Sequence, residues 1–270
     1  MQVFERGYLC FLIVLGAIAV VTPGIAQADT DRCHKLVASG NPDYPPYLWR
    51  NLENPNELIG ANADFMDRLS REIGIHIDVI YVGPWGRVQE EARSGKIDLI
   101  AGAFLTLPRM EYMDYVHPPF QGTETVIWTP ENYTMAYQKW DDLIGLEGLT
   151  VINNSFGQAF DTFARQSLTI RETPNLEQAL RMLSLSRADY LIYEEYPGAA
   201  YVARYNIEGI RAHAVPVSTE DLYITLSHQS PCNNGALRGR LAQAVFKLVQ
   251  EDVMTEMIAR NVARWGSDTN

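Results

Sequence analysis

The chain has 270 residues, 47% of them hydrophobic, and a formal net charge of −11 at pH 7. This length is sufficient for one large hydrophobic core or two modest ones. Lys and Arg number 22 against 33 Asp and Glu, without a basic cluster. That balance argues against nucleic acid and anionic lipid as partners, because both require a positively charged surface.

The first residues form a predicted export signal. Arg6 supplies a thin positive region, Tyr8–Val21 is apolar, and Ala26-Gln27-Ala28 is a small-x-small cleavage site. The apolar run is shorter than the roughly 20 residues that a membrane-spanning helix needs, which disfavours the alternative of a retained anchor. We therefore expect residues 1–28 to be removed as a signal peptide, and the mature protein to reside in the periplasm.

Processing at this site leaves two cysteines, Cys33 and Cys232. An even number of cysteines in an exported protein indicates a disulfide, since that compartment is oxidising. The alternative is two unpaired thiols. A bond between them would join the start of the mature chain to a point near its end.

Strand-like and helical patterns alternate along the chain, which is typical of an α/β fold. The first set consists of strands Lys35–Ser39, Ile75–Val82 and Asp98–Leu105 with helices Ala61–Gly74 and Val88–Arg93. After Pro118-Pro119 a second set follows: strands Thr125–Thr129, Leu149–Asn153, Leu168–Glu172 and Tyr190–Tyr193, with helices Phe156–Gln166 and Asn175–Arg187. A late strand, Leu222–Ser227, and one or two helices within 236–265 end the pattern.

The predicted disulfide bears on the domain organisation. If Cys33 and Cys232 are bonded, the C-terminal part folds back beside the N-terminal part, and the middle set becomes an inserted lobe. Two crossings would then join the lobes and leave a cleft between them. We predict a discontinuous lobe 1 from residues 29–122 plus 218–270, and an inserted lobe 2 from residues 123–217.

An ordered series of short motifs resembles the extracellular solute-binding proteins of the polar amino-acid uptake type, over about residues 35–265. The motifs are Tyr44-Pro-Pro-Tyr47, Ile59-Gly60, Asp64-Phe65, Pro84-Trp85, Ser94-Gly95-Lys96-Ile97-Asp98, Thr106-Leu-Pro-Arg109, Tyr115-Val-His-Pro118, Arg187-Ala-Asp189 and Trp265-Gly266. The resemblance implies a two-lobe type II periplasmic binding fold. Each lobe would be a mostly parallel sheet flanked by helices, and two hinge crossings would let the lobes close over a ligand.

The resemblance also implies two charged ligand contacts. Arg109, in a Thr-x-x-Arg pattern that begins at Thr106, matches the arginine that holds a ligand carboxylate, and a guanidinium can do so with two parallel hydrogen bonds. Alternatively, Arg109 pairs with Glu111 or solvent. Glu194 matches an acidic position that binds the ligand amino group, whereas Glu195 should point the other way, into solvent.

Three further positions are implied in the same way. Tyr44 and Trp85 match aromatic residues that cover the two faces of the ligand, although aromatic side chains are more often part of a core. Ser155 precedes a predicted helix, whose free N–H groups form an anion site. The simpler interpretation of Ser155 is an N-cap without ligand contact.

The sequence departs from the family pattern at the predicted carboxylate site. The segment from Asp98 to Arg109 is one residue shorter than usual, and Phe104 and Phe156 stand where hydroxyl side chains normally assist. The pocket is therefore expected to be less polar than usual, or the ligand is not a standard amino acid.

We expect a monomeric solute-binding protein that captures a small polar, amino-acid-like ligand and delivers it to an ABC permease in the inner membrane. No catalytic residue, cofactor or metal site is predicted, since the five histidines lack metal-ligand spacing. Two alternatives stay open: a cyclohexadienyl-type dehydratase on the same fold, and a ligand-sensing protein that signals to a membrane receptor.

Overall fold

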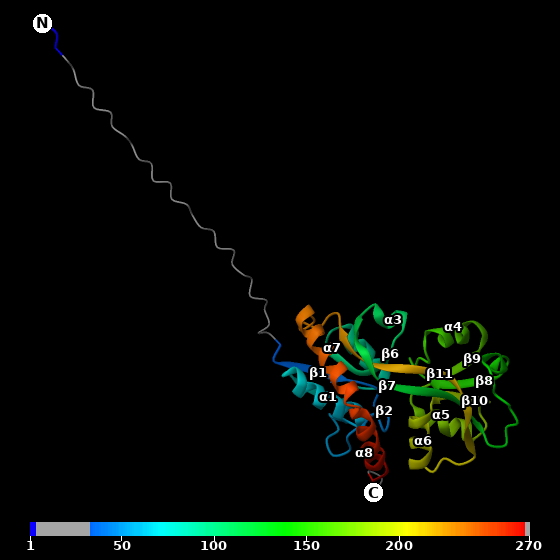
Figure 1. Cartoon of the computed structure of the whole chain (residues 1–270). Coiled ribbons are helices and arrows are strands. Elements are labelled where there is room, and N and C mark those ends of the chain that lie inside the picture. The colour runs from blue at the N-terminus through cyan, green and yellow to red at the C-terminus, as the bar shows by residue number, and fades with distance from the viewer. Residues whose placement is uncertain (4–32, 268–270) are drawn as a thin grey trace. The chain divides into compact units, whose positions relative to one another are not determined.

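The predicted strands and helices appear in their predicted order in the computed structural model, together with short elements and a helix that the pattern does not predict (Figure 1). The structure describes residues 1–3 and 33–267, so all but the first three residues of the predicted signal peptide, and its cleavage site, lie outside the described residues. Within the described residues, no helix is long and apolar enough to cross a membrane.

One half of the molecule, here called the first lobe, is built on three parallel strands. Strand β1 (Lys35–Ser39) lies between β5 (His76–Val79) and β6 (Leu99–Phe104) and is parallel to both. A small antiparallel sheet accompanies them, with strands β2 (Asp43–Tyr44), β3 (Leu48–Arg50) and β4 (Leu58–Ile59). The helices of this lobe are α1 (Ala61–Ile73), α2 (Trp85–Arg93), α3 (Leu107–Met110), α7 (Gly235–Gln250) and α8 (Val253–Ser267).

The other half, the second lobe, repeats this arrangement with a different part of the chain. Strand β8 (Glu147–Val151) lies between β9 (Thr169–Thr173) and β10 (Tyr190–Glu194), and all three are parallel. The helical elements are η1 (Trp140–Leu143), α4 (Gln158–Ser167), α5 (Leu176–Ser184) and α6 (Glu195–Arg204).

Two long strands connect the lobes. Strands β7 (Met113–Pro130) and β11 (Ile210–Ser227) pair antiparallel from Met113 opposite Ser227 to Pro130 opposite Ile210. They occupy the middle of one eight-stranded sheet of order β5-β1-β6-β11-β7-β10-β8-β9. In Figure 1 both strands run from the half that holds α1 and α7 to the half that holds α4 and α5. They are the two crossings that the sequence predicts.

Each lobe has its own hydrophobic core. In the first lobe, Phe65, Met66 and Leu69 of α1 are fully buried, because their spacing of three and four residues places them on one helix face. Gly74 ends this helix in the left-handed conformation, and its N–H bonds to the Ser70 carbonyl. In the second lobe, Leu149 of β8, Leu180 of α5 and their neighbours form a separate cluster. This second cluster also includes Trp49, Ile59 and Trp265 of the first lobe, so it extends across the boundary between the lobes on that side.

Cys33 and Cys232 form a disulfide, as the cysteine count predicts, with a Cα–Cα distance of 5.6 Å. It ties the residues before β1 to the turn before α7, so it lies wholly in the first lobe.

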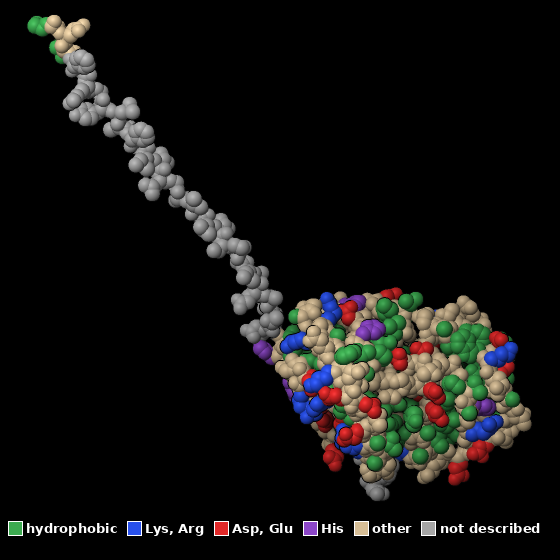
Figure 2. Space-filling view, in the orientation of Figure 1, with side chains coloured by type: hydrophobic (Ala, Val, Ile, Leu, Met, Phe, Trp, Pro, Cys, Tyr) green, Lys and Arg blue, Asp and Glu red, His purple; other side chains and the backbone are tan. Residues whose placement is uncertain are grey.

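On the face shown in Figure 2, Lys and Arg side chains stand in small groups among acidic ones.

Candidate ligand-binding site

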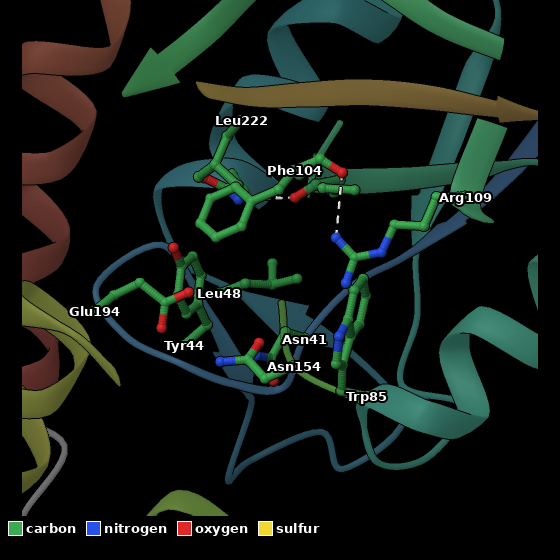
Figure 3. Close-up of a pocket in the computed structure, with 13 residues that line it drawn as sticks. Asn41, Tyr44, Leu48, Trp85, Phe104, Arg109, Asn154, Glu194 and Leu222 are labelled. Atoms are coloured by element: carbon green, nitrogen blue, oxygen red, sulfur yellow. Dashed lines mark hydrogen bonds between the residues drawn. The ribbon is translucent and has the colours of Figure 1, made fainter. Parts of the chain in front are cut away.

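A cavity lies between the lobes, close to the two connecting strands. Its volume is about 360 Å³, including the part open to solvent. It is lined by Asn41, Tyr44, Leu48, Asn62, Trp85, Ala101, Gly102, Ala103, Phe104, Arg109, Asn154, Glu194 and Leu222. Figure 3 shows the side chains of Arg109 and Glu194 on opposite sides of this space. Four of the six predicted ligand residues therefore line one cavity.

Arg109 is a buried cation at the end of the short helix α3, with a side chain only 5% exposed. Its Nη1 donates to the Phe104 carbonyl oxygen at 3.2 Å, and its guanidinium carbon lies 5.2 Å from the centre of the Trp85 ring. None of the ion pairs among the described residues includes Arg109. The predicted alternative pairing with Glu111 is therefore not formed, and the guanidinium keeps donors for an anion in the cavity.

Glu194 is the last residue of β10 and is 2% exposed. Its Oε2 has no hydrogen-bond partner within the part of the chain that the structure describes. Burial raises the pKa of this carboxyl to about 7, although its own backbone N–H, the nearby Asn154 amide and the Arg109 charge all lower it. The neighbouring Glu195 is exposed, because it begins α6 on the outer surface. The strand end thus aims one carboxyl group into the cavity and the next away from it.

Tyr44 and Trp85 each belong to a core cluster and also line the cavity. Tyr44 packs against Tyr47 with ring centres 5.1 Å apart. Trp85 is the first residue of α2, directly after Pro84. The Tyr44 hydroxyl and the Trp85 Nε1 each lack a hydrogen-bond partner among the described residues. Two buried polar atoms beside a cavity can form hydrogen bonds with a bound ligand.

Thr106 and Ser155 do not line the cavity, although both are buried. Thr106 is the N-cap residue of α3 and accepts backbone hydrogen bonds from Arg109 and Met110, each at 3.1 Å. The Ser155 hydroxyl donates to Asp161 Oδ2 at 2.5 Å, and the Phe156 N–H donates to the other oxygen of the same carboxylate at 2.8 Å. The Ser155 hydroxyl and the Phe156 N–H therefore have an internal carboxylate as their acceptor, and Gly157, not Ser155, is the N-cap residue of α4.

The two phenylalanines that depart from the family pattern have different positions. Phe104 lines the cavity, as Figure 3 shows, and makes this wall apolar. Phe156 points into the core of the second lobe, where its ring centre is 6.0 Å from that of Phe160. Only Phe104 therefore changes the polarity of the cavity.

Three asparagines in the cavity were not predicted. Asn154 Nδ2 and Asn62 Oδ1 both lack hydrogen-bond partners in the described part of the chain, while Asn62 Nδ2 donates to the Ala101 carbonyl at 2.7 Å. Asn41 completes the lining between the first strand and Tyr44. Asn154 follows strand β8 in a turn, a position that could have been singled out, but Asn62 looks like an ordinary residue in the first turn of an amphipathic helix.

Direct hydrogen bonds join the lobes around the cavity. The Tyr193 hydroxyl donates to the Asp43 carbonyl at 3.2 Å, and the Tyr201 hydroxyl to Asp43 Oδ1 at 3.1 Å. On the other side, the Leu107 N–H donates to Gln158 Oε1 at 3.0 Å. The described residues contain no group of three or more His, Cys, Asp or Glu placed to hold a metal ion.

A two-lobed α/β fold, with a buried cation and a buried carboxyl group facing one interlobe cavity, defines the class of solute-binding proteins. The family comparison agrees: residues 36–263 match the model of bacterial extracellular solute-binding proteins, family 3. The chain belongs to this family. No curated protein sequence matches the chain significantly.

Solved structures share the fold at low sequence identity. An amino-acid ABC transporter substrate-binding protein from Streptococcus pneumoniae, bound to L-arginine, has 17% identity and a TM-score of 0.69, covering 86% of this chain and 96% of its own. A mutant of ArgBP from T. maritima has 16% identity and a TM-score of 0.70, with 85% and 96% covered. A histidine kinase sensor domain similar to periplasmic binding proteins has 18% identity and a TM-score of 0.72, with the same coverage. The two-lobe type II fold is thereby confirmed.

Proposed function

We propose that this protein captures a small amino-acid-like ligand between its lobes and delivers it to an ABC importer. The observation that carries the proposal is the pair Arg109 and Glu194. Both side chains are buried, they come from different lobes, and they face one cavity without pairing with each other. A ligand with a carboxylate and an amino group supplies the partner that each of them lacks.

The same pair gives a reason for closure. Arg109 belongs to the first lobe and Glu194 to the second, so a ligand makes both contacts only when the lobes are together. A ligand that binds one state better shifts the population toward that state. We take residues 29–122 plus 218–270 and residues 123–217 as the bodies that move about β7 and β11. Tyr44 and Trp85 would cover the ligand, whereas Thr106 and Ser155 are left out of the proposed contacts because they do not line the cavity.

Family membership and the predicted export signal support the proposed cellular location and partners. After removal of residues 1–28 the monomeric protein would work in the periplasm and dock on a permease of the inner membrane. The relative from Streptococcus pneumoniae is named as an ABC transporter component, which supports this role. The similarity to a sensor domain supports the alternative in which the same closure signals to a membrane receptor.

One observation favours a second candidate function, a dehydratase. A carboxyl group whose pKa is about 7 is half protonated at neutral pH, and it could protonate the hydroxyl group of a cyclohexadienyl acid. The hydroxyl would leave as water while the ring carboxylate leaves as carbon dioxide, and the electron pair of the broken C–C bond would make the ring aromatic. The measurement is absorbance of an aromatic product during incubation with cyclohexadienyl acids. Turnover that Glu194→Gln abolishes would establish the enzyme, and absence of turnover by correctly folded protein would dismiss it.

The binding role is tested first by a thermal-shift screen against amino acids, polyamines, small carboxylates and sugars. A ligand stabilises the folded protein by about 2.7 kcal/mol at a hundredfold excess over its Kd. The best ligand is then titrated calorimetrically into the wild type and into Arg109→Ala. We expect affinity to fall by at least about 2 kcal/mol, because the ligand carboxylate is left without its partner.

Two further variants make the result interpretable. Arg165→Ala removes an exposed arginine of α4 that is remote from the cavity, and it should bind like the wild type. Arg109→Lys keeps the charge but loses the two-pronged contact, so its affinity should lie between those of the wild type and Arg109→Ala. Equal affinities for Arg109→Ala and Arg165→Ala would refute the assigned carboxylate contact.

A further inference from the structure

The charges that line the cavity set a limit on its occupant. Of the residues that line it, only Arg109 and Glu194 are charged. The rest of the lining is made of amides, aromatic rings, aliphatic side chains and small residues. An occupant with one anionic and one cationic group finds a partner for each. A third charge would be buried without a partner, which is strongly unfavourable.

In the second lobe, the two polar groups that directly precede α4 already have an acceptor. The Ser155 hydroxyl and the Phe156 N–H, which stand before α4, are both bound to the Asp161 carboxylate. This negative group also repels a carboxylate placed beside it. The carboxylate of an occupant is therefore held from the first lobe, by Arg109 and by the unpartnered Trp85 Nε1, whose ring lies beside the guanidinium in Figure 3. One carboxylate fits there.

The space left for the remainder of the occupant is small and partly apolar. Phe104, Leu222 and Leu48 line it together with the Tyr44 ring. A long side chain that ends in a guanidinium or ammonium group would find no second carboxyl group in this lining. Arginine, which the relative from Streptococcus pneumoniae holds, therefore lacks a matching site here.

From this arrangement, and resting on the function proposed above, we infer the substrate class: the cavity selects small zwitterions with an uncharged, largely apolar remainder, that is, neutral amino acids, over amino acids with charged side chains.

This substrate class has a pH signature. Burial gives the Glu194 carboxyl a pKa of about 7, and a ligand ammonium group beside it lowers that pKa, so binding releases a proton. Affinity must then rise with pH up to about 7, by at most tenfold per unit, and level off above it. A ligand that offers a carbonyl group instead, which can only accept, would favour protonated Glu194, and its affinity would fall as pH rises.

The groups around Glu194 do not produce the same signature. Tyr44, Tyr47 and Tyr193 interact with it, and burial raises the pKa of each, that of Tyr47 to about 12. Arg109 is the charged group that faces Glu194 from the first lobe. Asp43 joins the lobes through Tyr201, and burial raises the pKa of its carboxyl. The variant Asp43→Asn therefore measures how much Asp43 contributes to the pH dependence of ligand affinity.

The experiment is a calorimetric panel at about pH 7.5 with alanine, serine, leucine, phenylalanine, arginine, lysine, glutamate and aspartate. For the tightest ligand, the analogues without the amino group and without the carboxylate are added. We expect a neutral amino acid to bind, and the charged amino acids and both analogues to bind at least about 100-fold more weakly. If arginine or glutamate binds as tightly as the best neutral amino acid, the inferred selectivity is wrong and the proposed function still stands. Absence of binding by all of them would overturn both.

The pH arm uses the tightest ligand from about pH 5 to about pH 8. Glu194→Gln keeps the shape of the side chain, so it should flatten the pH profile and weaken binding. Glu195→Gln changes the exposed neighbour and should leave both unchanged. Affinity that falls with rising pH in the wild type, or a profile that Glu194→Gln does not alter, overturns the assignment of the ammonium contact.

Discussion

At the scale of single residues, Asp161 organises the start of α4. Its carboxylate accepts from the Ser155 hydroxyl and from the Phe156 N–H, and the Gly157 N–H lies 3.4 Å from the Ser155 oxygen. Helix N-termini carry N–H groups without intrahelical partners, and a carboxylate is a strong acceptor for them. This one side chain thus accepts from the Phe156 N–H and the Ser155 hydroxyl, which would otherwise be available to an anion.

We predict that Asp161→Ala lowers the free energy of unfolding by about 2 kcal/mol, because two buried donors lose a charged acceptor. Urea denaturation measures the change. The matched control is Asp67→Ala on α1, where the carboxylate makes an exposed ion pair with Arg71. Such a pair contributes at most about 1 kcal/mol. If both variants unfold at the same urea concentration, the stabilising role of the Asp161 hydrogen bonds is wrong.

The sequence predicted residue positions better than residue partners. The resemblance to the family implied Tyr44, Trp85, Arg109 and Glu194 as ligand contacts, and all four line one cavity. Their roles stay predictions. Ser155 shows the limit: a hydroxyl before a helix accepts or donates equally well to a ligand and to a carboxylate of its own helix. Nothing in the spacing from Ser155 to Asp161 distinguishes the two.

At the scale of elements, α8 is a third connection between the lobes, besides β7 and β11. On one side, Arg260 Nη2 and Asn261 Nδ2 bind Asp64 of α1 at 2.8 and 2.6 Å. On the other, Trp265 Nε1 donates to the Ala200 carbonyl of α6 at 3.1 Å. The Trp265 ring packs against Trp49 and Tyr201, with ring centres 5.4 and 5.7 Å apart. The last helix therefore holds both lobes.

We predict that Trp265→Ala lowers the free energy of unfolding by about 3 to 5 kcal/mol, the usual cost of removing a large buried ring. Chemical denaturation followed by circular dichroism measures it. Trp265→Phe keeps most of the ring packing and loses the bond to Ala200, so it should cost about 1 to 2 kcal/mol. Phe246→Ala, at an exposed position of α7, should change stability by less than about 0.5 kcal/mol. Equal effects of Trp265→Ala and Phe246→Ala would contradict the role of α8.

Helices and strands were predictable where the apolar residues follow one clear spacing. The two strands that connect the lobes were not predictable in this way. The apolar spacing in Ala61–Gly74 predicts α1 to within one residue, and Lys35–Ser39 is β1 as predicted. Strand β7 was expected only at Thr125–Thr129, because Pro118-Pro119 interrupts the pattern, yet the strand continues through both prolines. Strand β7 is extended along its whole length because it pairs with β11, and this long-range pairing is not visible in the local sequence. Helix α6 was missed because it follows Glu194 without a loop.

At the scale of the whole molecule, the disulfide determines which part of the chain is restrained. Cys33 and Cys232 are 199 residues apart in sequence, and the loop between them contains the entire second lobe. Both ends of the loop nevertheless lie in the first lobe, where Cys232 belongs to the hydrophobic core and Cys33 packs against it. The bond restrains the unfolded chain strongly but does not cross the cavity. Stability and ligand affinity should therefore respond to its removal in different ways.

We predict that replacing both cysteines by serine lowers the free energy of unfolding by about 2 to 5 kcal/mol, since a loop of this length has a large closure entropy in the unfolded state. Urea denaturation with and without reductant measures the effect. Reductant should shift the midpoint of the wild type toward that of the double variant and leave the double variant unchanged. Ligand affinity, determined by calorimetry well below the unfolding transition, should stay within about threefold of the wild type, because the cavity contacts belong to other residues. If ligand affinity falls strongly while stability is unchanged, the prediction is wrong. The disulfide would then hold the lobes in their binding arrangement instead of stabilising the fold of the first lobe.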